Sequence, residues 1–223
     1  MAALAAPDDL TEVAARLDRE HPATIVRWAF ERFGTGLITT ASFEDAVLVH
    51  LAATQAPGTD VVLLDTQYLF AETWWYADRV TNRLGIPLRV ERPVPGIEPD
   101  DRWEHDVEGC CGVRKVEPLA RVLEGRAAWL TGIRRVDGPT RADAPAVQWD
   151  ERRQLVKVNP LVALSDDDLA LYEELYELPR HPLKDKGYPS IGCWPCTRPV
   201  APGEDPRAGR WAGSNKTECG IHT

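Results

Sequence analysis

The hydrophobic residues of this chain fall into two patterns, helical spacing and short continuous apolar runs, and these patterns alternate along the sequence. Residues 8–33 show helical spacing with an interruption near His21-Pro22, which predicts two helices. Apolar runs at 36–40, 61–66, 88–92 and 128–132 predict strands, with helical segments between them. Strands that alternate with helices are typical of a parallel, doubly wound sheet, in which ligands bind at the carboxyl ends of the strands.

The second half of the chain continues this alternation and then becomes irregular. Residues 147–158 alternate between apolar and polar side chains around a charged turn and predict a hairpin. Ser165 precedes three aspartates and predicts the start of a helix. From His181 onward the chain reads as loop. We therefore expect an α/β fold, a mostly parallel sheet with helices on both faces, in a single domain over residues 1–223, with an irregular, cysteine-bearing segment over residues 181–223.

Composition and charge narrow the class of protein. No apolar run approaches the roughly 18 residues that span a bilayer, and the first residues lack the basic region of a signal peptide. We therefore expect a cytoplasmic protein with no membrane partner. The net charge of −9 argues against a nucleic-acid partner, because binding to phosphates needs a basic surface. An anionic substrate would have to meet positive charge that is gathered locally.

The loops after the predicted strands are the candidate ligand sites. The first runs from Thr40 to Asp45 and leads into a helix, so that backbone N–H groups and the helix dipole point at a loop where Ser42 could donate to an anion. Helix capping by Ser42, with Asp45 complementing the dipole, is the more ordinary interpretation of this segment alone. The second loop, residues 65–70, could hold an adenine against its aromatic side chains, which could equally be part of the core.

The five cysteines divide into four that form two pairs and one that stands apart. Cys110 and Cys111 are adjacent, Cys193 and Cys196 form a C-x-x-C pair, and Cys219 lies on a short polar tail. In a cytoplasmic protein such pairs are more often metal ligands or catalytic thiols than structural disulfides. An odd cysteine set apart from a metal-binding set is a candidate nucleophile.

The spacing of the pairs favours an iron–sulfur cluster over a single ion. Zinc ribbons use two knuckles in which a two-residue gap wraps the chain around a tetrahedral ion, and adjacent cysteines cannot form such a knuckle. A cluster spreads its ligands over several irons, so neighbouring residues can bind different irons. We therefore expect a [4Fe–4S] cluster, with zinc as the alternative. Basic residues such as Lys115, Arg207 and Arg210 would offset the charge of the cluster, bind an anionic substrate and lower the pKa of a nearby thiol.

These motifs resemble the assimilatory adenylyl-sulfate reductases, the iron–sulfur branch of the sulfonucleotide reductase family, over nearly the whole chain. The most specific segments are Cys110-Cys111-x-x-Arg114-Lys115-Val-Glu-Pro-Leu, Tyr188-Pro-Ser-Ile-Gly-Cys193-x-Pro-Cys196-Thr-Arg-Pro and Lys216-Thr-Glu-Cys219-Gly-Ile-His222. Weaker matches are Leu64-Asp65-Thr66 and Thr131-Gly132-Ile-Arg134. The resemblance implies an adenine nucleotide α-hydrolase-like fold and the conversion of adenosine 5′-phosphosulfate to sulfite and AMP, with thioredoxin as the electron donor.

The resemblance also implies a role for each matching residue. Cys219 would be the nucleophile, whose thiolate attacks the sulfate sulfur, expels AMP and becomes an S-sulfocysteine that thioredoxin resolves to sulfite. Cys110, Cys111, Cys193 and Cys196 would bind the [4Fe–4S] cluster. The residues implied in substrate binding are Thr40, Ser42, Asp45, Leu64, Thr66, Lys115, Gly132, Arg134, Arg207, Arg210 and His222.

Two departures from the family pattern bear on the alternatives. Many members carry a run of tryptophans where this chain has Trp211-Ala-Gly-Ser-Asn, so we expect a more flexible hinge in the tail. The first loop lacks the double glycine of related ATP pyrophosphatases, which disfavours an ATP-dependent thiolation enzyme of the same superfamily. The four paired cysteines favour the substrate without a 3′-phosphate, with a 3′-phosphoadenylyl-sulfate or dual-specificity reductase as the alternative. A zinc-binding module without enzymatic activity is a further alternative, and the sequence leaves open whether the chain forms a homo-oligomer.

Overall fold

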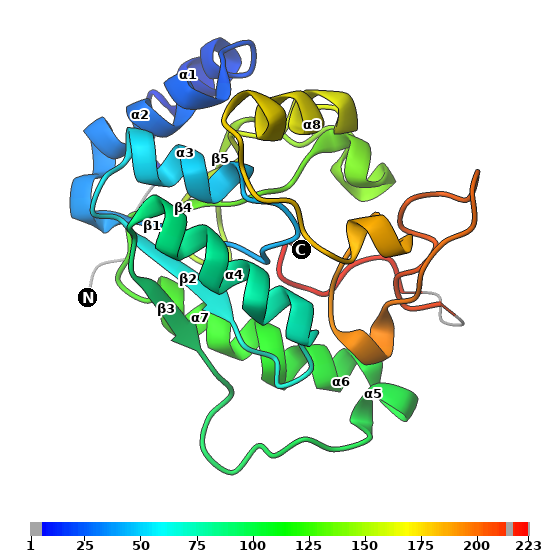
Figure 1. The fold of residues 1–223 in the computed structure, drawn as a ribbon. Coiled ribbons are helices and arrows are strands. Elements are labelled where there is room, and N and C mark those ends of the chain that lie inside the picture. Colours follow the sequence, from blue (N-terminus) through cyan, green and yellow to red (C-terminus); the bar gives the residue numbers. More distant parts are fainter. Residues whose placement is uncertain (1–5, 213–215, 223) are drawn as a thin grey trace.

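The structure, a computed structural model, describes residues 6–212 and 216–222, and Figure 1 shows its course. Within these residues, six strands form one sheet in the order β3-β2-β1-β4-β6-β5, in which β5 is antiparallel to β6 and the other pairings are parallel. The strands are β1 (Leu37–Thr40), β2 (Asp60–Leu64), β3 (Leu88–Glu91), β4 (Ala128–Leu130), β5 (Val147–Asp150) and β6 (Leu155–Val158). The helices are α1 (Leu10–Leu17), α2 (Pro22–Phe33), α3 (Val47–Gln55), α4 (Ala71–Leu84), α5 (Arg102–His105), α6 (Val107–Cys111), α7 (Glu117–Leu123) and α8 (Asp166–Leu175).

Successive side chains of the strands point to opposite faces of the sheet and enter two separate hydrophobic cores. Leu37 and Leu130 belong to the larger core, to which α1, α2, α3, α4 and α8 contribute. Ile38 and Trp129 belong to the smaller core, which α7 covers. Figure 1 shows α3 and α4 in front of the sheet and α7 behind it. The prediction of a mostly parallel sheet with helices on both faces is therefore confirmed.

The local sequence signals act as expected at several element boundaries. α1 and α2 are separated at His21, whose side chain accepts a hydrogen bond from the amide of Ala23 at the start of α2. The predicted hairpin is present as β5 and β6. Ser165 and Asp168 form a reciprocal capping box at the start of α8. Within the part of the chain that the structure describes, no helix combines the length and apolar character needed to cross a bilayer.

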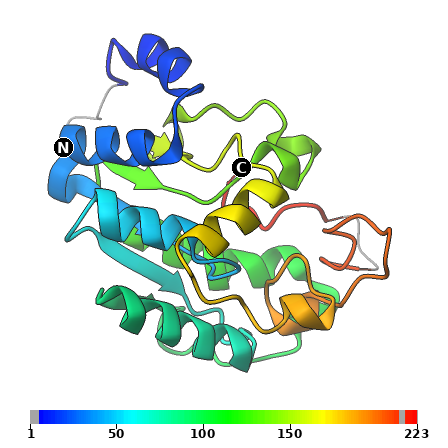
Figure 2. The same cartoon turned by 45° about the horizontal axis from the view of Figure 1, so that its top comes forward.

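The strand order creates a topological switch point beside β1. The chain passes from β1 to β2 and β3 on one side, and then returns to β4 on the other side of β1. The loops that follow β1 and β4 therefore run in opposite directions and leave room for a ligand at the carboxyl ends of the strands. In Figures 1 and 2 the C-terminal segment, coloured orange to red, projects from one side of the molecule and turns back towards its middle.

The C-terminal segment is attached to α4 where it begins, at His181. This histidine is 1% exposed, and its Nε2 lies 3.2 Å from Oγ1 of Thr73. Its Nδ1 accepts a hydrogen bond of 3.1 Å from the amide of Leu183. Because an imidazolium has no acceptor nitrogen, the native ring is neutral and Nε2 donates to Thr73.

His181 is expected to make stability depend on pH in the acidic range. Burial, together with the charge of Lys184, lowers its pKa from 6.5 to about 4. The unfolded chain therefore binds this proton at a higher pH than the folded chain, and stability is lost as the pH falls from about 6.5 towards 4, by up to about 3 kcal/mol. We expect the Tm of the wild type to fall further between pH 7 and pH 5 than that of His181→Asn. Equal falls in the two proteins would contradict this assignment.

Candidate active site

The loop between β1 and α3 forms one wall of a cavity at the carboxyl ends of the strands. Phe43 adopts a left-handed backbone conformation, with φ of 55°, and buries its ring, whereas Ser42 is exposed at the cavity. Asp45 Oδ1 accepts a hydrogen bond of 2.9 Å from the amide of Val47 and so satisfies the first turn of α3. Ala46 occupies the cap position, and no side chain caps the helix there. The interpretation of Ser42 as the cap is therefore wrong, because Ser42 lies too early in the loop.

The residues that the sequence resemblance assigned to substrate binding all lie around this one cavity, which has a volume of about 210 Å³. They come from the loops after β1, β2 and β4, from a π-helical turn at Gly112–Val116, and from the C-terminal segment. Cys219 lies in the wall of the same cavity. The substrate-binding candidates around it are Thr40, Ser42, Asp45, Leu64, Thr66, Lys115, Gly132, Arg134, Arg207, Arg210 and His222.

Positive charge is concentrated in this cavity although the chain as a whole is acidic. Burial and the nearby guanidinium groups of Arg210 and Arg141 lower the pKa of Arg207. In the described residues, Arg134 Nη1, Arg210 Nε and His222 Nδ1 are buried without a hydrogen-bond partner. Buried donors and cations that lack partners are costly unless a ligand satisfies them, so this cavity is suited to an anion.

Arg210 is held between the cavity and the C-x-x-C pair. Its Nη1 donates to Oγ of Ser190 at 3.1 Å and to the carbonyl oxygen of Ile191 at 3.3 Å, and its guanidinium stacks 4.7 Å from the ring centre of Trp211. A Cβ atom at Gly192 would collide with the Arg210 guanidinium. The glycine therefore allows this cation to approach the backbone closely, and a larger residue would displace it.

Trp211 is the first residue of the segment in which the sequence predicts a flexible hinge, and its side chain is buried. Its side chain is 5% exposed, and its amide donates to the carbonyl oxygen of Cys196 at 2.9 Å. Thr197 and Arg210 form an isolated antiparallel bridge beside it. The remaining hinge residues Gly213, Ser214 and Asn215 lie outside the described residues, so the expected flexibility stays a prediction.

Cys219 is partly buried, and residues before and after it in the tail make contacts with the body of the fold. Glu218 forms an ion pair with Arg141, in which Nε of the arginine lies 2.7 Å from Oε1 of the glutamate. The His222 ring stacks on Trp129, with ring centres 5.4 Å apart and an interplanar angle of 12°. Burial lowers the pKa of His222 well below its usual value, so this ring is neutral at pH 7.

Lys115 joins the cavity to the region of the paired cysteines. It lies on the π-helical turn directly after Cys111, and π-helical turns often occur at functional sites. Burial alone would lower the pKa of Lys115, but the facing thiols of Cys193, Cys219 and Cys111 outweigh it and raise this pKa. The ammonium group is therefore charged and near both the odd thiol and the pairs.

The four paired cysteines meet in a second, smaller cavity next to the first. The C-x-x-C segment reaches it because Cys193 bridges to Leu69 in the loop after β2 and the amide of Trp194 donates to the carbonyl oxygen of Tyr68. The Cys193 sulfur lies 3.2 Å from Oγ1 of Thr66, which connects this cavity to the loop after β2. All four are free thiols, and the cavity is lined by Cys110, Cys111, Cys193 and Cys196.

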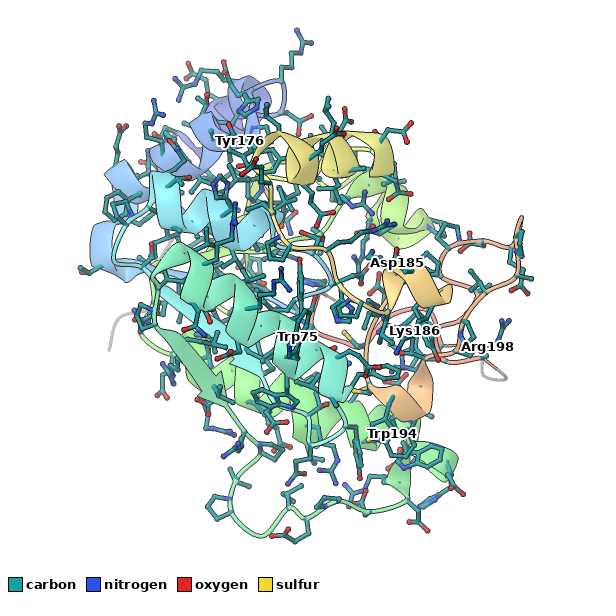
Figure 3. The ribbon with its side chains drawn as sticks, viewed as in Figure 1. Trp75, Tyr176, Asp185, Lys186, Trp194 and Arg198 are labelled. Atoms are coloured by element: carbon teal, nitrogen blue, oxygen red, sulfur yellow. The ribbon has the colours of Figure 1, made fainter. Side chains whose placement is uncertain are left out.

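The surroundings of the paired cysteines include an exposed tryptophan. Across residues 6–212 and 216–222, no three or more His, Cys, Asp or Glu side chains are grouped so that they could hold one metal ion. Trp194, between the two thiols of the C-x-x-C pair, is 50% exposed, and its ring centre lies 5.9 Å from that of Trp103 in α5. Figure 3 labels Trp194 at the surface beside α5, so the smaller cavity lies near solvent at this end of the molecule.

Comparison with known proteins assigns this chain to a family. Residues 37–199 match the family described as the phosphoadenosine phosphosulfate reductase domain. The chain belongs to this reductase family. A relative named adenosine 5′-phosphosulfate reductase, from Rhodococcus opacus (strain B4), is 45% identical over 96% of this chain and 95% of its own length. A relative of the same name from Streptomyces coelicolor is 44% identical over 96% of this chain and 95% of its own length.

Solved structures support the membership in the reductase family. The crystal structure of phosphoadenylyl-sulfate (PAPS) reductase from Candida auris, as a phosphate complex, matches with a TM-score of 0.76 and 25% identity, over 88% of this chain and all of that chain. A crystal structure of FMN adenylyltransferase from Candida glabrata matches with a TM-score of 0.61 and 15% identity, over 88% of this chain and 69% of that chain. The second likeness shows the fold alone.

Sequence reasoning missed the carboxylates that pair with the arginines of this cavity. Asp137 and Glu218 face the cavity arginines, and neither was a candidate. Glu44 accepts a hydrogen bond from the amide of Ile191, and Lys184, Arg210 and Arg207 lower its pKa in spite of burial. The position of Glu218 directly before Cys219 was the one available signal.

Proposed function

We propose that this chain reduces adenosine 5′-phosphosulfate to sulfite and AMP in sulfate assimilation, with thioredoxin as the electron donor. The observation that carries the proposal is that Cys219, the unpaired cysteine, shares one cavity with a concentration of buried cations at the switch point of the sheet. A nucleotide that carries a phosphosulfate supplies the negative charge that such a cavity needs. The relatives that match almost the full length of the chain are named for this reaction.

In the first step the Cys219 thiolate attacks the sulfur of the bound phosphosulfate. A bond forms between the cysteine sulfur and the sulfate sulfur, and the bond from that sulfur to the phosphate oxygen breaks. AMP leaves with the electron pair, and Cys219 becomes an S-sulfocysteine. Arg134, Arg207 and Arg210 can stabilise the charge that develops on the departing phosphate, since they line the cavity that Cys219 faces.

In the second step a dithiol donor reduces the S-sulfocysteine. One thiolate of the donor attacks the sulfur of Cys219, sulfite leaves with the electron pair of the sulfur–sulfur bond, and a mixed disulfide forms. The second thiol of the donor then resolves this disulfide and restores Cys219. The paired cysteines line the smaller cavity, and we assign them to the metal centre, so in this proposal both thiols of the donor belong to a partner protein.

We propose that Cys110, Cys111, Cys193 and Cys196 hold a [4Fe–4S] cluster. The donor set fits this group, because four free thiols line one cavity and the adjacent Cys110 and Cys111 can bind different irons of a cluster. When bound, the cluster supplies fixed negative charge at this end of the cavity. Lys115, which lines both cavities, holds a positive charge between that charge and Cys219.

The percentages of residues that this chain shares with its relatives favour the substrate without a 3′-phosphate. Relatives named for adenosine 5′-phosphosulfate share 44–45% of their residues with this chain, against 25% for the PAPS reductase of known structure. The cytoplasm is the compartment in which thioredoxin and free thiols are kept reduced. We therefore propose a cytoplasmic reductase specific for adenosine 5′-phosphosulfate.

The proposed activity is tested with protein purified without air. Sulfite and AMP are measured after addition of adenosine 5′-phosphosulfate, reduced thioredoxin and a thioredoxin-regenerating system, and in parallel with the 3′-phosphorylated nucleotide. We expect sulfite and AMP in equal amounts from the first nucleotide and a much slower reaction with the second. Iron, sulfide and zinc are assayed on the same sample. A protein that releases no sulfite from either nucleotide would overturn the proposal.

Lys115→Gln is expected to reduce kcat/KM by about 10- to 100-fold while leaving the iron content unchanged. The substitution removes a charge near Cys219, and the loss of one charge-assisted contact has effects of this size. Lys186→Gln is the matched control, because Lys186 pairs with Glu72 at the surface, where Figure 3 labels it. An equal effect of both substitutions would contradict a specific role for Lys115.

A further inference from the structure

The tail that carries Cys219 is fixed by two arginines from the body of the fold, one on each side of the cysteine. We propose that Arg141 and Arg153 are positioning residues that hold Cys219 at the cavity for the first step, without taking part in the chemistry. This inference rests on the proposed role of Cys219 as the nucleophile. Arg141 follows β4, and Arg153 lies in the turn between β5 and β6.

Arg141 binds the residue directly before Cys219. Its Nε lies 2.7 Å from Oε1 of Glu218, and its Nη2 lies 2.7 Å from Oε2, so that the guanidinium and the carboxylate are paired through two parallel hydrogen bonds. Thr140 donates a third hydrogen bond of 3.0 Å to the same carboxylate. The side chains of Arg141 and Glu218 are only 11% and 10% exposed. A bidentate pair that is shielded from water fixes both distance and orientation, which a single exposed ion pair does not.

Arg153 binds the chain two residues after Cys219. Its Nη2 donates to the carbonyl oxygen of Ile221 at 2.6 Å, while its Nη1 is held by Asp150 at 2.7 Å. The guanidinium also lies 5.3 Å from the ring centre of Trp129, on which His222 stacks. We call the Arg141–Glu218 pair and the Arg153–Ile221 hydrogen bond the two tail clamps. Between the two clamps Gly220 takes a φ of +80°, which turns the chain sharply beside Cys219. The tail has no helix or strand of its own here, so these side chains fix its course.

The tail clamp on Glu218 is connected to Arg134, one of the arginines that line the cavity. Asp137 accepts from Arg141 at 3.0 Å and from Arg134 at 2.9 Å, so one carboxylate joins the tail clamp to a cavity arginine. Arg134 also has a buried Nη1 without a partner in the described residues. An anion that binds Arg134 would therefore act on the same ion-pair network that holds Glu218. This arrangement ties the position of the nucleophile to the occupation of the cavity.

The two steps of the proposed reaction make opposite demands on the clamps. The first needs the Cys219 sulfur in line with a substrate inside the cavity, where small displacements slow the attack. The second needs the same sulfur to meet a large protein, so the tail must leave the cavity. Weakening a clamp should slow the formation of S-sulfocysteine and should not slow its reduction. A residue needed only for folding would slow both steps.

The experiment compares Arg141→Gln and Arg153→Gln with the wild type and with Arg126→Gln. Arg126 forms a similar pair with Asp60 at 2.6 Å, at the opposite end of the strands, and is the matched control. In the absence of a reductant, S-sulfonation of Cys219 is followed by mass spectrometry after addition of adenosine 5′-phosphosulfate. Pre-formed S-sulfonated protein is then mixed with reduced thioredoxin, and sulfite release is timed. Iron content and circular dichroism identify any variant that has lost its fold.

We expect both variants to form S-sulfocysteine about 10- to 100-fold more slowly and to release sulfite at the wild-type rate or faster. Charge exchange, Arg141→Glu with Glu218→Arg, should restore part of the loss. Wild-type formation rates in folded variants, or equal slowing of both steps, would overturn the inference. Alkylation of Cys219 by iodoacetamide without nucleotide should be faster in both variants and unchanged in Arg126→Gln. This reaction tests the clamps even if the wild type forms no S-sulfocysteine, in which case the proposed function fails separately.

Discussion

Cys219→Ser is expected to abolish sulfite formation, by at least about 10³-fold, and to leave the iron content unchanged. A serine hydroxyl is not ionised at neutral pH and cannot form the thiosulfonate bond of the proposed intermediate. Cys219 lines the larger cavity and is absent from the wall of the cavity of the paired cysteines. Activity is measured as sulfite release with thioredoxin, and the cluster by iron analysis and absorption near 400 nm on the same anaerobic sample.

The outcome of this substitution separates three assignments. Loss of activity with full iron content supports a nucleophile that is distinct from the cluster ligands. Loss of iron in Cys219→Ser would contradict the division of the five cysteines into four ligands and one nucleophile. Full activity in this variant would favour the alternative in which the tail thiol is dispensable and the paired cysteines bind zinc in a module without enzymatic activity.

Cys193→Ser is expected to lose the cluster and, with it, most of the activity. Cys193 lies where the two cavities meet, with its sulfur 3.2 Å from Oγ1 of Thr66 and its backbone bridged to Leu69. An alkoxide is a poor substitute for a thiolate at iron, so one ligand of the cluster would be missing. Metal analysis and absorption of anaerobically purified protein should show iron well below that of the wild type, and Tm should fall.

The matched comparison is Cys219→Ser, which removes one thiol without touching the paired set. Iron at wild-type level in Cys193→Ser would contradict the ligand assignment. A colourless wild type that contains about one zinc per chain would contradict the cluster itself, and Cys193→Ser would then be expected to lose zinc. Neither result depends on the nucleotide, so the cofactor proposal can fail while the proposed reaction stands.

The course of the chain was readable from the sequence because local signals and the global fold agree. The apolar runs became β1, β2, β3 and β4, and the alternating segment at 147–158 became the β5–β6 hairpin. The position of the loop after β1, behind a strand and before a helix, made it a candidate ligand loop, and the structure places it in the wall of the cavity. The wrong detail, capping by Ser42, arose because the left-handed turn at Phe43 shifts the loop, and a bulky aromatic residue gives no sign of such a conformation.

The grouping of the five cysteines was predicted from their spacing, and the cations that line the cavity were named from their position near the cysteines and from the family resemblance. Contacts between distant segments could not be predicted in this way. Arg141 and Glu218 are 77 positions apart, and their pairing depends on how the tail returns to the loop after β4. Trp129 looked like an ordinary strand residue, but the smaller core directs its ring towards His222. No local pattern marks such partners, since the tertiary packing decides them.

Gly192 gives a criterion for reading related chains. A relative could retain all five cysteines and the counterparts of Arg207 and Arg210 in the C-terminal segment. It could still carry a larger residue at the position of Gly192. Because a Cβ there would displace the guanidinium of Arg210, we expect that relative to assemble the proposed metal centre and yet bind the proposed phosphosulfate substrate weakly. A cysteine count would then predict the metal centre but not the substrate. Assignment of substrate in divergent members requires the residue before the C-x-x-C pair to be read together with the arginine that packs against it.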